Sequence, residues 1–161
     1  METNYIQKEN KVWLWAQSFA LLGGTVFAWS NVVTQFIDFY DVYGTVFRFR
    51  DCTIPNPLGT ACLYGAVAFF VAFVWSLRVL QTLNGTHQKY LKNFLIFCVL
   101  FAASVFSLEV AEYYALIPAG TPSVSCTPGA HPLATPCFYG MLFFIASLTS
   151  AIVITREKRY V

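Results

Sequence analysis

Two nearly identical phrases decide the fold of this chain: "NPLGTACLYG" at residues 56–65 and "HPLATPCFYG" at residues 131–140. Each carries Pro-Leu, a threonine, a cysteine and Tyr-Gly in the same register, and each stands directly before a long apolar run. Internal repeats are a recurring way of building bundles of membrane helices. The phrases therefore predict one unit built twice: an apolar span, a loop that ends in the phrase, and a second span.

The composition indicates a membrane protein. Of the 161 residues 57% are hydrophobic and only 11% are charged, whereas soluble domains carry about 25% charged residues. The apolar residues gather in four runs, at 12–37, 63–80, 94–108 and 138–155. A helix of about 20 apolar residues crosses a hydrocarbon core about 30 Å thick. We expect an all-α membrane protein with four transmembrane helices, and one integral membrane domain over residues 1–161.

The first run is expected to remain as a span. It is too long for a cleaved signal peptide, and Gln17 and Asn31 interrupt its apolar sequence.

The basic residues predict the orientation. Only Arg48 and Arg50 lie on one side of the spans, and the other eight cations lie on the opposite side: Lys8, Lys11, Arg78, Lys89, Lys92, Arg156, Lys158 and Arg159. Cytoplasmic segments carry the excess of lysine and arginine. Both termini and the link at 81–92 are therefore expected in the cytoplasm, with the two cysteine-bearing loops outside the plasma (inner) membrane. The net charge of +2 comes from these flanks, and gives no argument for a nucleic-acid partner.

The likeness of the two halves reaches beyond the phrases. "IDFYDVY" at 37–43 and "LEVAEYY" at 108–114 close the first and third spans, which matches Asp38 and Asp41 with Glu109 and Glu112. We therefore expect two tandemly repeated helical hairpins, at about 12–80 and 91–155, related by an axis along the membrane normal.

The four carboxylates form a candidate polar site. Residues three apart share a helix face, so each pair can direct both carboxylates the same way. They could bind a hard cation or carry protons, since acids within membranes are costly and often functional. Alternatively, they cap the bundle in the head-group layer.

Five cysteines are present, and four of them fall in or beside the outer loops. Cys98 lies within the third run and is expected to be a small buried apolar residue. The simplest pairing of the others is 52–62 and 126–137, although four cysteines allow three pairings. Each disulfide would staple its loop and stabilise the fold by about 3 kcal/mol. His131 beside Cys126 and Cys137 fits no standard zinc spacing, so no metal site is expected.

A redox role is the second interpretation of these cysteines. Cys62 and Cys137 each open a membrane helix, where unpaired N–H groups and the helix dipole stabilise a thiolate. The thiolate is the species that attacks disulfides. Arg48 and Arg50, just before Cys52, could lower a thiol pKa or contact an anionic head group or a quinone oxygen.

Four spans, cytoplasmic termini and one cysteine pair in each outer loop resemble the disulfide-bond formation protein B family, and the chain is similar to the vitamin K epoxide reductase family in its four-helix core. The resemblance implies a thiol–disulfide oxidoreductase that passes electrons from a soluble extracytoplasmic thiol protein to a membrane quinone. It implies that Cys52 and Cys62 are the quinone-proximal pair, Cys126 and Cys137 the substrate-facing pair, and Arg48 or Arg50 the quinone contact. Both families place a Cys-x-x-Cys at a helix mouth, and this chain has none.

Three functions therefore remain open from the sequence. The first is a thiol–disulfide relay coupled to a quinone. The second is a non-enzymatic scaffold, or an accessory subunit that binds other membrane subunits and carries structural disulfides. The third is a carboxylate-lined path for cations or protons.

Overall fold

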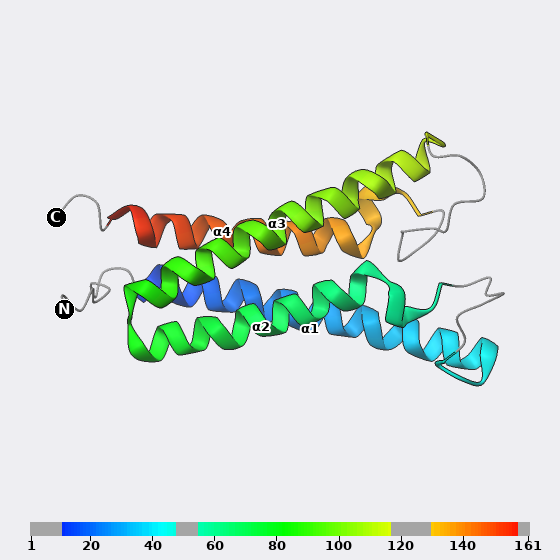
Figure 1. The fold of residues 1–161 in the computed structure, drawn as a ribbon, viewed down its shortest axis with the longest axis horizontal. Helices are drawn as coiled ribbons and strands as arrows, with labels where there is room; N and C mark the ends of the chain where they lie inside the picture. The colour runs from blue at the N-terminus through cyan, green and yellow to red at the C-terminus, as the bar shows by residue number, and fades with distance from the viewer. Residues whose placement is uncertain (1–10, 48–54, 117–129, 158–161) are drawn as a thin grey trace.

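The computed structural model describes residues 11–47, 55–116 and 130–157. Within them, four long helices form a bundle (Figure 1): α1 (Lys11–Tyr43), α2 (Ala61–Thr82), α3 (Gly85–Tyr113) and α4 (Pro136–Glu157). All four are long and apolar enough to cross a membrane, and large apolar side chains on their outer faces are exposed where lipid would lie. The prediction of an all-helical, multi-pass membrane protein is confirmed at this level.

The helices run up and down in sequence order. α1 packs against α2 and α4, and α3 packs against α4 and α2. The start of α1, the end of α4 and the turn between α2 and α3 lie at one end of the bundle (Figure 1). This places the beginning and end of the bundle on the same side, as expected, whereas the assignment of that side to the cytoplasm stays a prediction.

The connection between α2 and α3 is much shorter than the link of 81–92 expected from the apolar runs. Leu83 adopts a left-handed conformation with φ of 49°, which ends α2, and its N–H donates to Val79 O. The Asn84 side chain then accepts a hydrogen bond from Thr86 N at 2.9 Å and caps α3. Helix α3 therefore begins at Gly85, well before its apolar run, because a local cap rather than hydrophobicity sets its start.

An aromatic stack lies in the centre of the bundle. The rings of Phe69 on α2 and Phe144 on α4 are parallel within 5°, with centroids 3.7 Å apart. Gly24 on α1 makes room for them, since a Cβ there would lie 2.4 Å from Phe69 Cε1. Small residues let membrane helices approach closely, and here the glycine admits a ring from the next helix. Cys98 is 3% exposed, which confirms the prediction that it is buried.

The two repeated phrases fold alike into what we call the joints, residues 56–62 and 131–137. Each contains a short 3₁₀ helix, η2 (Pro57–Gly59) or η3 (Pro132–Ala134). The side chain before each proline accepts a hydrogen bond from the backbone two residues on, at 2.8 Å for Asn56 and 3.3 Å for His131. Thr60 and Thr135 then precede the first turns of α2 and α4.

Candidate functional site

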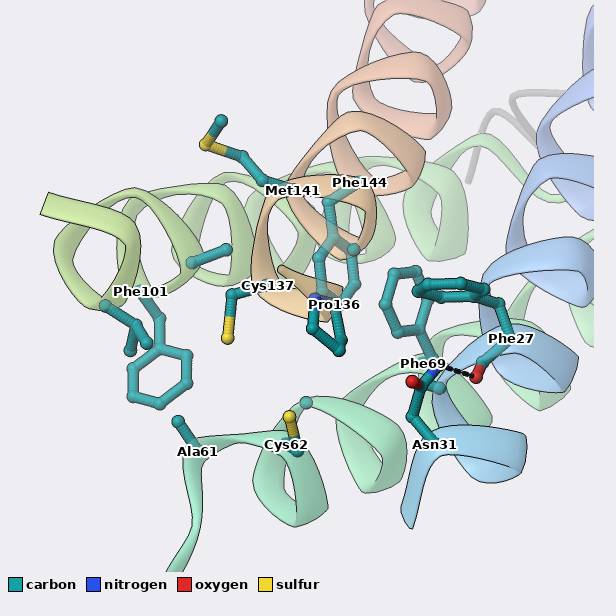
Figure 2. A pocket seen from close by; sticks show the side chains of 15 residues that line it. Phe27, Asn31, Ala61, Cys62, Phe69, Phe101, Pro136, Cys137, Met141 and Phe144 are labelled. Atoms are coloured by element: carbon teal, nitrogen blue, oxygen red, sulfur yellow. Dashed lines mark hydrogen bonds between the residues drawn. The ribbon is translucent and has the colours of Figure 1, made fainter. Parts of the chain in front are cut away.

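The two joints deliver Cys62 and Cys137 to one cavity. The cavity has a volume of about 60 Å³ and lies between the helices near the joint end of the bundle. Cys62 lies in the first turn of α2 and Cys137 in the first turn of α4. Figure 2 shows both sulfur atoms directed into the space between these two helices. The structure thus brings together two cysteines that the expected pairing places in separate loops.

The wall of the cavity is built from matching positions of the two halves. Several wall residues of α1 recur 74 positions later in α3, and several wall residues of α2 recur 75 positions later in α4. The wall contains the pairs Phe27 and Phe101, Ala28 and Ala102, Cys62 and Cys137, Gly65 and Gly140, and Phe69 and Phe144. It is therefore a largely apolar, aromatic chamber beside two sulfur atoms.

One matching pair of wall positions differs in polarity. Asn31 of α1 lies where α3 has Val105. Its Nδ2 donates to Phe27 O at 2.8 Å (Figure 2). A ligand in the cavity would therefore meet one polar side chain among rings and aliphatic groups.

A buried carboxylate stands beside Cys137. Glu109 of α3 is only 3% exposed, and its Oε2 accepts a hydrogen bond from Thr135 Oγ1 at 2.9 Å. The Cys137 thiol hydrogen-bonds to the same carboxylate. No nitrogen or oxygen donor in the described part of the chain reaches Oε1. A buried acid with so few partners in a helix apolar enough to cross a membrane is a candidate functional residue.

The other half places a neutral amide at the same position. Thr60 Oγ1 lies 3.4 Å from Gln35 Oε1, as Thr135 Oγ1 lies 2.9 Å from Glu109 Oε2. Each hydroxyl also reaches the carbonyl of the proline three residues before it, at 2.9 Å for Pro57 O and 2.8 Å for Pro132 O. Gln35 is therefore the counterpart of Glu109, and the expected match of Glu109 with Asp38 is wrong by about one helical turn. The sequence match is based on the similar spacing of the two acidic pairs. The structural match is based on which side chain contacts the threonine of each joint. The side chain beside the joint threonine is thus an ionisable carboxylate in the second half and a neutral amide in the first.

The remaining predicted carboxylates do not join this site. Asp38 and Asp41 are exposed and Glu112 is partly exposed. The described residues contain no group of three or more histidine, cysteine or acidic side chains that could hold a metal ion. The acids near the joint end are therefore not gathered into one cation site in the described structure.

Several predicted site residues lie outside the described ranges: Arg48, Arg50, Cys52 and Cys126. The disulfides 52–62 and 126–137 and the arginine contact to a quinone stay predictions.

Sequence reasoning missed Gln35, Asn31 and the four phenylalanines of the wall. Aligning the two halves of the whole chain by the separation of the two cysteine phrases could have identified them. Comparison with protein families, with curated proteins and with solved structures gives no match.

Proposed function

We propose that this chain is a membrane thiol–disulfide oxidoreductase that uses an apolar quinone as its electron acceptor. The observation that carries the proposal is the shared cavity, where Cys62 and Cys137 meet four aromatic rings. Binding sites for small molecules are typically apolar and aromatic with a few polar groups. A quinone ring matches that chemistry, and Asn31 offers the polar contact. At about 60 Å³ the cavity is smaller than the roughly 150 Å³ that holds a benzene ring, so the helices would have to move apart to admit the quinone.

The chemistry requires two electrons and two protons to move together. A dithiol that forms a disulfide loses two electrons and two protons, and a quinone that gains them becomes a quinol. Thiol–disulfide exchange through Cys137 and Cys62 would bring the oxidising equivalents to an extracytoplasmic dithiol protein. In this proposal the predicted partners Cys52 and Cys126 complete the two pairs.

The near-identity of the two halves is compatible with a relay. We infer that the halves are related by an internal twofold axis, on which the stack of Phe69 and Phe144 and the cavity lie. A relay needs two unlike cysteine pairs. Glu109 lies beside the second joint where Gln35 lies beside the first, so the surroundings of the two cysteines differ in charge and in proton chemistry.

Thiol-dependent quinone reduction by the purified protein tests this function. In lipid nanodiscs supplied with a reduced dithiol and a short-chain ubiquinone, we expect quinol formation that Cys137→Ser and Cys62→Ser each abolish. Cys98→Ala is the matched control, since Cys98 is buried away from the cavity wall, and it should retain the full rate.

Two results would contradict the proposal. The first is a wild-type protein that forms quinol no faster than the Cys137→Ser variant does. The second is loss of folded protein on Cys→Ser substitution with no reducible pair in the wild type, which the scaffold function predicts.

A further inference from the structure

The proposed function leaves open which cysteine starts the exchange, and the joints themselves offer an answer. Both cysteines line the same cavity, and both lie in the first turn of a helix. Helix position therefore does not distinguish them. The difference lies in the residue that accepts the threonine hydroxyl, which is Gln35 in the first joint and Glu109 in the second.

Glu109 has a function beyond holding the joint together, as its counterpart shows. The Thr60 hydroxyl donates to Pro57 O at 2.9 Å and lies 3.4 Å from Gln35 Oε1, so the first joint closes beside an uncharged amide. A neutral amide is therefore enough for the structural role. A carboxylate at 3% exposure costs free energy of burial, so a structural role alone gives no reason for an acid in the second joint.

We infer that Glu109 is the catalytic base of Cys137, which makes Cys137 the attacking thiol; this inference rests on the proposed function. Three observations carry it: Glu109 is buried, it hydrogen-bonds the Cys137 thiol, and its Oε1 meets no nitrogen or oxygen donor among the described residues. Thr135 Oγ1 contacts one carboxylate oxygen at 2.9 Å, and the Cys137 thiol hydrogen-bonds to the same carboxylate.

The exchange step balances without a further reactant. Cys137 Sγ attacks one sulfur of a disulfide, and its proton moves to Glu109. The new bond joins Cys137 to that sulfur while the old S–S bond breaks. The second sulfur leaves as a thiolate, which then takes a proton from Glu109 or from water. The site carries one negative charge before and after the attack, so no additional charge is created in an apolar region where charge is costly.

The base assignment is tested by the rate of Cys137 exchange in isosteric variants. Protein with Cys98→Ala is reduced, placed in nanodiscs and exposed to 4,4′-dithiodipyridine, an apolar disulfide. The Cys137 thiol remaining at each time is alkylated after denaturation and measured by peptide mass spectrometry. General bases contribute about 10²- to 10⁴-fold to rates, so we expect Glu109→Gln to slow the reaction about 100-fold.

The matched control is Gln35→Glu, which places a carboxylate in the first joint. It should leave the Cys137 rate within about twofold of the parent. Thermal unfolding of Glu109→Gln should also match the parent, because the first joint closes with the amide of Gln35 at the same place. If Glu109→Gln fails to fold, Glu109→Asp replaces it in the test. A folded Glu109→Asp protein whose Cys137 exchange rate is about tenfold lower than that of the parent supports the assignment.

The outcomes separate the inference from the function beneath it. Equal Cys137 rates in the parent and in folded Glu109→Gln or Glu109→Asp overturn the base assignment alone. A parent protein whose Cys137 does not react overturns the proposed function and this inference with it.

Discussion

At the residue scale, the contact between Gly24 and Phe69 decides how closely α1 approaches α2. The glycine is buried, and the ring of Phe69 occupies the space that a side chain would take. The same ring stacks on Phe144 and forms part of the cavity wall. A methyl group at residue 24 would therefore disturb both the packing and the candidate site.

Gly24→Ala should destabilise the bundle by about 1–3 kcal/mol, the usual cost of overpacking a core. The reason is the distance of 2.4 Å between the added Cβ and Phe69 Cε1. Unfolding of the detergent-solubilised protein by a denaturing detergent measures the effect. Gly65→Ala is the control, since a Cβ at residue 65 meets no atom within 4 Å, and it should be neutral or stabilising. Equal stability of the two variants would contradict this account of the packing.

At the scale of elements, the joints are built from short-range hydrogen bonds. The Asn56 side chain accepts a hydrogen bond from Leu58 N and donates one to Val46 O at 3.0 Å. The second bond ties the joint to the segment after α1. His131 provides the corresponding cap in the second joint, where it is exposed and its hydrogen bond is longer at 3.3 Å. The first joint is therefore held more firmly by its capping residue.

Asn56→Ala should cost about 1–2 kcal/mol and His131→Ala about 0.5 kcal/mol, by analogy with the loss of a helix cap. Asn56→Asp keeps the acceptor and loses the donor, so its cost should fall between zero and that of the alanine variant. Unfolding of purified protein measures all three. If His131→Ala lowers the free energy of unfolding more than Asn56→Ala does, the first joint is not the one held more firmly by its cap.

At the scale of the whole molecule, the bundle has two ends that differ in charge. The end that carries the turn between α2 and α3 also carries Lys11, Arg78, Lys89, Lys92 and Arg156. The joints lie at the opposite end (Figure 1). By the positive-inside rule, the joint end and the cavity near it should face outward.

Labelling with a membrane-impermeant maleimide tests this orientation. Cysteines introduced at exposed positions 59 and 134 should react in right-side-out vesicles, and one introduced at exposed position 86 should react only after permeabilisation. Peptide mass spectrometry distinguishes these sites from the native cysteines. Labelling of position 86 from outside, without labelling of 59 and 134, would reverse the orientation.

The sequence by itself determined the four apolar helices and the likeness of the joints. Both depend on local information: apolar runs long enough for a bilayer, and Asn-Pro or His-Pro followed by threonine at a fixed spacing. Only the tertiary structure decided that Cys62 and Cys137 share one cavity and that Glu109, rather than Asp38 or Asp41, is the buried acid. The physical reason is that helix rotation and approach fix these contacts, and they are set by distant pairs such as Gly24 with Phe69 and Glu109 with Thr135.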